Sequence, residues 1–287
     1  MLNLPELSNV WYEIRGNLAS LAGLTMVLAF VSVALLAPWI APYPEEGWGL
    51  TYSSKRRFLP PSLEHPFGTD ELGRDVLSRV ILGARTSLLI AFSVVFLSMM
   101  IGGFIGIIAG YLGGNMGTLI MRVVDMFLAF PPLLLALAIA ATIGRGFVNA
   151  IIALTISWWP WYSRLAYVQT LSIKNMPYVE AARTIGVSDF WIMVRHIFPN
   201  TLPPMIIQAS MDLGSAILEA AGLSFLGLGV QPPAPDWGLM VSTGRIHIRR
   251  AWWISFFPGM AIFLTVLGFN LVGDALREGM DPRLRRV

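Results

Sequence analysis

The chain contains no cysteine, and it has only three histidines among its 287 residues. The absence of cysteine excludes disulfides, thiolate metal sites and cysteine nucleophiles. Charged residues are also scarce, at 13%, against roughly 25% in an ordinary soluble domain. Hydrophobic residues make up 55% of the chain. This composition excludes an ordinary soluble domain and indicates an integral membrane protein.

Several chemical functions lack the residues they need. The net charge is +3, but the basic residues lie in loops beside apolar runs, where cytoplasmic flanks and lipid headgroups account for them better than nucleic acid does. His65, His196 and His247 are scattered without metal-ligand spacing, so we expect no metal site in this chain. The phosphate-binding pattern GxxxxGKS/T and the metalloprotease pattern HExxH are both missing. The chain is therefore not expected to hydrolyse ATP.

A spanning helix needs about 20 mostly apolar residues, and six segments meet that need. We therefore expect an all-α membrane protein with six transmembrane helices. The first apolar run follows a short segment, 1–17, and is too long for a cleaved signal peptide, which favours a retained anchor. Pro131-Pro132 interrupts the third segment, and Pro160 lies inside the fourth. The six expected spans are 18–40, 87–111, 119–143, 148–171, 202–228 and 252–272.

Counting basic residues leaves the orientation open. If both termini lie on one side of the membrane, that side and the opposite side collect ten lysines and arginines each. Six of the second set lie in one long loop, 41–86, and long loops weigh less in such a count. The count therefore favours cytoplasmic termini without deciding the matter.

The 41–86 loop is expected to contain a short amphipathic helix that leads into the second span. Thr69 is a good N-cap, and apolar residues then recur every four positions, at Leu72, Val76, Val80 and Ala84. Whether this loop covers the pore or contacts another protein stays open at this point.

The stretch YVEAARTIGVSDFWIMVRHIFPN, 178–200, is charged, although long apolar runs flank it. Asn175 and Pro177 predict a helix start, and Gly186 predicts its end. Ser188 then predicts the cap of a second short helix, and Pro199 marks the return to the membrane. Two physical interpretations remain: an amphipathic helix pair resting on lipid headgroups, or a projection that fits a socket on another protein.

This stretch resembles the EAA motif of permease subunits in binding-protein-dependent ABC importers. It has Glu180-Ala181-Ala182, then Gly186, then His196-Ile197-Phe198-Pro199; many relatives have leucine where Phe198 stands. Three further blocks are similar to the second permease type of the dipeptide, oligopeptide and nickel branch. They are HPFGTDELGRDVLSRVILGARTSL (65–88), LEAAGLSFLGLGVQPPAPDWG (218–238) and GDALREGMDPRLRR (273–286). The resemblance thus runs from residue 65 nearly to the end, with its blocks in the expected order.

The resemblance implies a type I ABC importer permease in the plasma (inner) membrane of a prokaryote, with both termini cytoplasmic. A coupling loop, 172–200, would dock on cytoplasmic ATPase subunits, which would bind ATP and magnesium. The implied coupling residues are Tyr178, Glu180, Ala181, Ala182, Arg183, Gly186 and Asp189. The implied partners are a second homologous permease, two ATPase subunits and an extracytoplasmic solute-binding protein. In this interpretation 1–17 and 275–287 are cytoplasmic, 41–86 is extracytoplasmic, and 87–274 is the permease core.

Two carboxylates in the fifth span raise a separate question. Asp212 and Glu219 are seven residues apart and hence near one helix face, at a depth where ionisable groups are costly. They either line the translocation path, or pair with a polar group of a neighbouring helix. Elsewhere, Asp125 is expected to pair with Arg122 three residues before it, and Arg164 to snorkel or form an ion pair.

Alternatives from other classes remain. An intramembrane hydrolase would need a nucleophile and a base such as Ser224 and His247, and a structural scaffold subunit would need neither. Neighbouring genes for a second permease, ATPases and a secreted binding protein would favour transport. The cargo implied by resemblance is a di- or oligopeptide, with nickel complexes, glutathione-like peptides and oligosaccharides as alternatives.

Overall fold

The computed structural model describes residues 15–280, and helices are the only regular elements there beside one isolated bridge between Thr69 and Asp75. The prediction of an all-α chain is therefore confirmed for these residues. In chain order the elements are α2 (Leu18–Ile40), α3 (Pro44–Gly47), η1 (Ser54–Arg56), α4 (Val76–Leu112), α5 (Gly114–Leu128), α6 (Pro132–Ile143), α7 (Phe147–Ile173), α8 (Pro177–Thr184), α9 (Asp189–Ile192), the π-helical turn η2 (Met193–Ile197), α10 (Phe198–Phe225), α11 (Trp237–Gly244), η3 (Arg245–His247) and α12 (Trp253–Met280). Most of the expected 1–17 segment and the end of the 275–287 tail lie outside the described residues.

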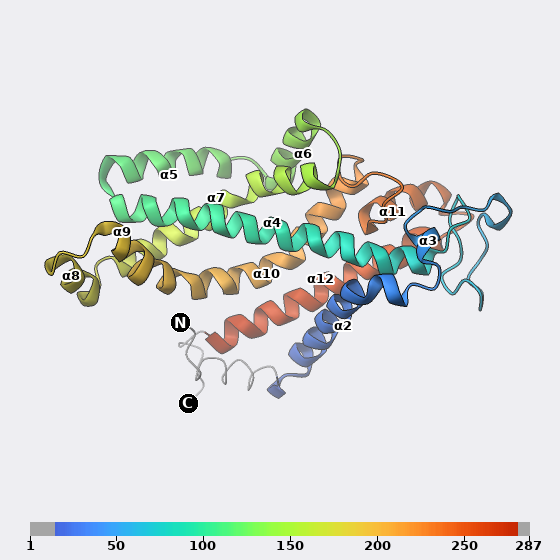
Figure 1. Ribbon diagram of the computed structural model, residues 1–287, viewed down its shortest axis with the longest axis horizontal. Coiled ribbons are helices and arrows are strands. Elements are labelled where there is room, and N and C mark those ends of the chain that lie inside the picture. Colours follow the sequence, from blue (N-terminus) through green and yellow to red (C-terminus); the bar gives the residue numbers. More distant parts are fainter. Residues whose placement is uncertain (1–14, 281–287) are drawn as a thin grey trace.

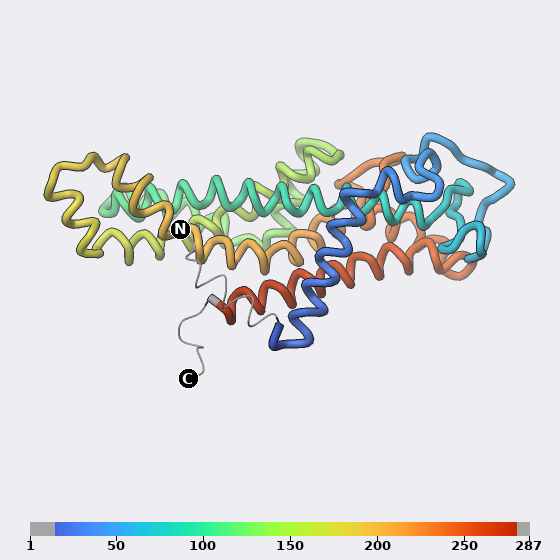
Figure 2. Tube along the Cα trace, turned by 60° about the horizontal axis from the view of Figure 1, so that its bottom comes forward, coloured from blue at the N-terminus to red at the C-terminus, as the bar shows by residue number. Residues whose placement is uncertain are grey.

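The molecule is elongated, and α4, α7 and α10 run along its length (Figure 1). The short helices α8 and α9 lie at one end, which we call the knob, residues 177–192. The opposite end, which we call the cap, consists of residues 41–75 and 231–252. Figure 2 shows α2 crossing the bundle at an angle, where it packs on α12 and α4. The knob and the cap are thus separated by the full length of the bundle.

Each of the six expected spans is helical, but the third is not one straight helix. Three helices are long and apolar enough to cross a membrane: α2, α4 and α12. The pair α5 and α6 passes the same test jointly, although it bends by 87° at its break. Pro131 stands at that break, where it lacks an N–H to continue the helix and restricts the residue before it. Hence the described residues hold three such spans, or four if the bent pair is one, and the count of six stays a prediction.

The expected amphipathic helix after Thr69 is the first part of α4 and begins later. Asp75 caps α4 by accepting a hydrogen bond from the Ser78 N–H at 2.7 Å. The Thr69 hydroxyl instead accepts the Leu59 N–H at 2.8 Å and holds the loop. The predicted cap at Thr69 is therefore wrong, because two cap-type residues compete and the loop engages the first of them.

Close packing of α4 on α7 depends on glycine. A Cβ added at Gly102 would lie 2.2 Å from the Trp159 carbonyl oxygen, and one at Gly106 would lie 2.2 Å from that of Ser163. The Ser163 hydroxyl also donates to the Gly102 carbonyl at 2.9 Å. Small residues let the two backbones approach, as expected for helices in lipid. The two helices are therefore held as a tightly fitted pair.

A buried ionic cluster organises the cap. The Asp70 carboxylate lies 2.7 Å from Arg74 Nε and 3.6 Å from Arg79 Nε, and all three side chains are buried. Arg79 also lies 3.4 Å from the carbonyl oxygens of Gly47 and Pro233, so it joins α4 to the end of α3 and to the loop at Pro233. Buried charges persist only when paired and hydrogen-bonded. The cluster therefore ties chain segments that are far apart in sequence.

Tryptophans and an aspartate extend this attachment. Trp237 Nε1 donates to the Val80 carbonyl at 2.9 Å, and Trp253 Nε1 donates to the Thr69 carbonyl at 3.0 Å. Asp236 accepts hydrogen bonds from the Leu239 N–H and from the Ser87 hydroxyl. Burial raises the pKa of Asp236 above its ordinary value, and these donors oppose that rise. The cap, which includes α11, is thus fixed to the beginnings of α4 and α12.

Candidate coupling and translocation sites

The knob is a helix, a tight turn and a second short helix. Pro177 begins α8 and is tolerated there because the first helical turn needs no N–H from it. Gly186 ends the turn with φ of +84°, a conformation that costs other residues strain. Asp189 starts α9, and the helix continues through the π turn into α10. The predicted helix–glycine–helix order is therefore present, and the knob is covalently continuous with a long helix.

The motif residues of α8 divide between two faces. Glu180 and Ala181 are exposed, and Tyr178 is about half exposed. Ala182 is buried and packs inside the chain with Val179. Only the first alanine therefore offers its surface to another molecule, whereas the second lets α8 pack on its own bundle.

The outermost part of the knob is apolar. Ile185 is 80% exposed, beside the positive-φ glycine, and Phe190 is 64% exposed. Trp191 is also exposed and contacts Phe190 edge to face. Large exposed apolar side chains on a charged loop favour a contact with another molecule or with lipid. Sequence reasoning missed Ile185, although its position before Gly186 indicates a side chain at a turn.

Arg183 and Asp189 both contact the bundle, although each of them is exposed on one side. The Tyr111 hydroxyl, near the end of α4, donates a hydrogen bond to the Asp189 carboxylate. The Arg183 guanidinium carbon lies 5.7 Å from the centre of the Tyr111 ring. Lys174 Nζ, just before α8, lies 2.8 Å from the Gly110 carbonyl oxygen. The knob is thus fastened to the end of α4, which the sequence does not indicate.

The two carboxylates of α10 both have partners on α7. Tyr162 donates its hydroxyl to Asp212 at 2.7 Å, and Gln208 donates to the other oxygen at 2.9 Å. Trp158 Nε1 donates to Glu219 at 2.7 Å. Trp158 and Tyr162 are four residues apart, as one helix face requires. The pairing with neighbouring-helix groups is therefore present, and it leaves both carboxylates only partly covered.

A polar groove lies beside Asp212, between α10 and α12. Its volume is about 330 Å³. Carboxylates and amides dominate its lining, which consists of Gln208, Met211, Asp212, Ser215, Asn270 and Asp274. Sequence reasoning missed Asn270 and Asp274, because only the packing of α12 on α10 brings them to Asp212. The groove can accept hydrogen-bond donors and positive charge.

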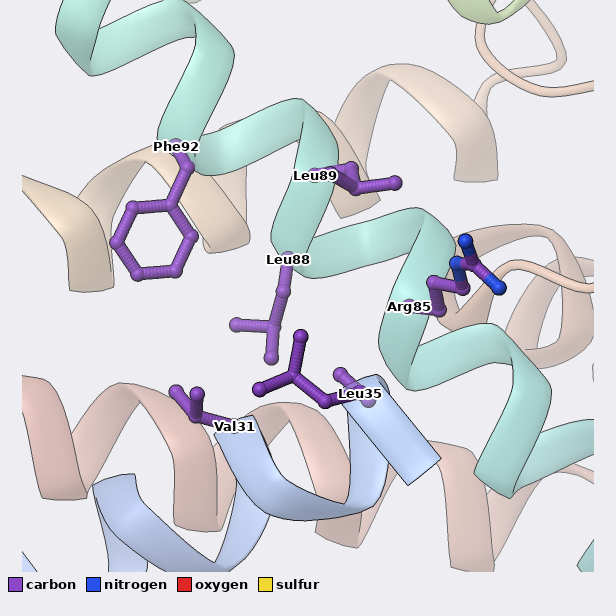
Figure 3. Close-up of a pocket in the computed structure, with 7 residues that line it drawn as sticks. Val31, Leu35, Arg85, Leu88, Leu89 and Phe92 are labelled. Atoms are coloured by element: carbon purple, nitrogen blue, oxygen red, sulfur yellow. The ribbon is translucent and has the colours of Figure 1, made fainter. Parts of the chain in front are cut away.

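A second opening, between α2 and α4, is of a different kind. Figure 3 shows Val31, Leu35, Leu88 and Phe92 around it, with the Arg85 guanidinium directed away from them. Its volume is about 210 Å³. Apolar walls suit a lipid chain, whereas a polar solute would lose its hydrogen bonds there. We therefore assign the polar groove, and not this cleft, as the candidate solute site.

The remaining sequence predictions have mixed outcomes. Asp125 pairs with Arg164 of α7, so the expected pair with Arg122 is wrong; the packing of α5 on α7 supplies a partner that sequence proximity does not. The expected ion pair of Arg164 is present. Within residues 15–280 no group of three potential metal ligands occurs. Ser224 accepts from the Val230 N–H, while His247 packs on Phe58, and the two are not hydrogen-bonded to each other.

These helices, with a fastened knob and a polar groove, match a class of membrane transport proteins. Residues 102–286 match the family described as "Binding-protein-dependent transport system inner membrane component". Residues 7–61 match the "N-terminal TM domain of oligopeptide transport permease C". The chain belongs to this family of inner-membrane permease components.

Several curated relatives cover nearly the whole chain. The "Di/tripeptide transport system permease protein DppC" of Pseudomonas aeruginosa is 45% identical and covers 98% of this chain and 93% of its own length. The "Probable D,D-dipeptide transport system permease protein DdpC" of Escherichia coli is 43% identical and covers 96% and 90%. The "Glutathione transport system permease protein GsiD" of Escherichia coli is 44% identical, with 96% and 91% covered. The chain is thus similar to peptide and glutathione permeases over its full length.

Two solved structures share the fold. An inward-facing MetNI methionine ABC transporter has a chain with a TM-score of 0.56 and 19% identity, covering 71% of this chain and 97% of its own. An amino acid ABC transporter crystallised with histidines has a TM-score of 0.50 and 17% identity, covering 68% and 91%. At such identity the likeness shows the fold alone.

Proposed function

We propose that this chain is a permease subunit of an ATP-driven importer and forms half of a translocation path for di- or oligopeptides. The observation that carries the proposal is the full-length similarity to peptide permeases, at 41–45% identity for the dipeptide relatives. The helical bundle with partly covered carboxylates supports it. Nickel complexes and oligosaccharides are the alternative cargoes. A glutathione-like peptide falls within the proposed peptide class, because one relative is a glutathione transport permease.

The knob is proposed to dock on ATPase subunits made by other chains. Its apolar tip around Ile185 would be the buried centre of that contact, and Glu180 and Tyr178 would lie at its margin. Ala181 would permit close approach, and Gly186 would set the turn. ATP can drive import only if it binds two conformations of the assembly unequally. The knob is the part of the chain placed to transmit that difference.

The proposed assembly has four kinds of partner. They are a second homologous permease, two ATPase subunits that bind ATP and magnesium, an extracytoplasmic solute-binding protein, and membrane lipid. Docking of the knob on the ATPases places it in the cytoplasm, so the cap at the other end is extracytoplasmic. Both termini are proposed to be cytoplasmic as well. Nothing in this chain holds a cofactor in the proposed mechanism.

Reconstitution tests this function. The chain is co-purified with the second permease and the ATPases of its importer and placed in proteoliposomes. Binding protein is then added after loading from a panel of labelled peptides, nickel complexes and oligosaccharides. ATP-dependent accumulation of a di- or oligopeptide is expected. Uptake without the ATPase subunits, or uptake restricted to another cargo class, would contradict the proposal.

The polar groove is proposed to be part of the path and to contact the ammonium group of a peptide. Asp212 and Asp274 are its two acids, and Glu219 lies further along the same helix face as Asp212. A carboxylate attracts an ammonium group. At membrane depth it costs free energy unless a bound cation or a hydrogen-bonding partner compensates its charge. Tyr162 and Gln208 would hold Asp212 in place, and Trp158 would hold Glu219, while both carboxylates stay only partly covered.

Replacing both α10 carboxylates with amides is expected to slow uptake of peptides with a free amino terminus. The variant Asp212→Asn with Glu219→Gln keeps the side-chain shapes and can still accept the Tyr162 and Trp158 hydrogen bonds. The apparent affinity for import should fall about ten-fold for free peptides, as for loss of one charged contact, and change little for N-acetylated ones. Uptake of every transported peptide at the unaltered rate would remove the path role.

A further inference from the structure

Tyr111 connects two charged residues of the knob to the bundle. It is the penultimate residue of α4 and is 9% exposed. Its hydroxyl donates to Asp189 on α9, while Arg183 on α8 lies over its ring. A single side chain therefore touches both short helices of the knob. A hydrogen bond from a neutral hydroxyl to a carboxylate is stronger than a hydrogen bond between two neutral groups.

A second contact fixes the same place. The Lys174 ammonium lies 2.8 Å from the Gly110 carbonyl oxygen, one residue before Tyr111. The last carbonyls of a helix lack intrahelical partners, and a cation placed there is favourable. The chain entering the knob and the helices within it are therefore both attached to the end of α4.

The other end of α4 is anchored as firmly. Asp75 caps it, and Arg79 lies in the buried cluster of the cap. Among the five long helices described, α4 alone has no internal proline. Its 37 residues extend about 55 Å as a continuous helix. A prolyl-free helix fixed at both ends is suited to carry displacement from one end to the other.

We propose that Tyr111 is a positioning residue that locks the knob to α4, so that movement of the knob reaches the cap through this helix. The inference rests on the proposed function, and it assigns Arg183 and Asp189 to the inner attachment rather than to the ATPase surface. Without the lock, the knob could tilt about Gly186 and its junction with α10 and leave α4 unmoved. Coupling between the ends is reciprocal, so docking of loaded binding protein on the cap should also reach the ATPases through α4.

The test uses the whole importer with Tyr111→Phe, Asp189→Ala and their combination. Tyr111→Phe removes the hydroxyl and keeps the ring under Arg183. Loss of a hydrogen bond to a charged group shifts an equilibrium by about ten-fold or more. We expect ATPase subunits to co-purify normally and basal ATP hydrolysis to persist, while stimulation by peptide-loaded binding protein falls about ten-fold, as does peptide imported per ATP. The double variant should be no worse than either single one, because all three lack the same contact.

Tyr167→Phe is the matched control. Tyr167 is a partly buried tyrosine of α7 that packs with Ala109 and Met121 rather than with the knob, and loss of its hydroxyl should leave stimulation unchanged. Normal stimulation in Tyr111→Phe would overturn the lock. So would release of the ATPase subunits by Tyr111→Phe or Asp189→Ala, because these residues would then belong to the docking surface. If the wild-type protein binds no ATPase subunit at all, the proposed function itself would instead be overturned.

Discussion

Replacing Ile185 with glutamate is expected to release the ATPase subunits and to stop import. Ile185 is 80% exposed at the tip of the knob, so the change leaves the fold of this chain intact. Burying an isoleucine contributes about 1.5–3 kcal/mol, and burying an unpaired carboxylate costs more than that gain. Docking should weaken at least about a hundred-fold, which corresponds to roughly 2.7 kcal/mol. Co-purification of the ATPases and ATP-dependent peptide uptake measure the effect.

Ile246→Glu serves as the control for this experiment. Ile246 is 77% exposed but lies in the cap, at the opposite end of the molecule. The same substitution there should leave the ATPases bound, and Ile185→Leu should keep most of the affinity. Retention of the ATPases by Ile185→Glu, at wild-type stoichiometry, would show that the tip is not the docking surface.

The order of elements in the knob follows from local sequence chemistry. Pro177 and Gly186 act through their own backbones, so their positions alone predict where α8 begins and turns. The direction in which each side chain faces is a tertiary property. Ala182 points into the bundle, and Asp189 reaches Tyr111, which is 78 residues away in sequence. No local pattern carries that information.

The spans show the same difference between what local sequence predicts and what tertiary packing decides. Apolar length identified every long helical segment, because covering hydrocarbon is a property of composition. The prolines at 131 and 132 indicated an interruption, but the 87° bend depends on how α5 and α6 pack on α7. The start of α4 was placed too early, because Thr69 and Asp75 are both good caps and only the folded loop selects between them.

The carboxylates of α10 were found from periodicity, but their partners were not. Seven residues place Asp212 and Glu219 near one face of any helix. Tyr162 and Trp158 meet them only because α7 packs beside α10 in this register. Asp274 joins the groove through α12 in the same way. Helix–helix contacts, and not sequence spacing, therefore complete the candidate path.

Asp70→Asn is expected to produce the largest loss of stability. The carboxylate is buried and faces Arg74 and Arg79, while its second oxygen accepts the N–H groups of Leu72 and Arg74. Asparagine keeps the volume but leaves two buried guanidinium groups with Glu71 as their remaining nearby acid. Removing one partner from a buried ion pair costs about 3–5 kcal/mol. The free energy of unfolding in detergent should fall by that amount.

Glu64→Gln distinguishes this effect from a general loss of negative charge in the cap. The Glu64 side chain is 70% exposed, and its one ionic neighbour, His65, is 3.9 Å away. Exposed pairs of this kind contribute about 0–1 kcal/mol. The control should therefore have the same free energy of unfolding as the wild-type protein. Because Arg79 also reaches the loop at Pro233, Asp70→Asn should loosen both cap loops together, which hydrogen exchange at residues 41–75 and 231–236 would reveal. Equal stability of the two variants would mean that the arginines are neutralised by water or lipid, and that the cap is held by its tryptophan contacts instead.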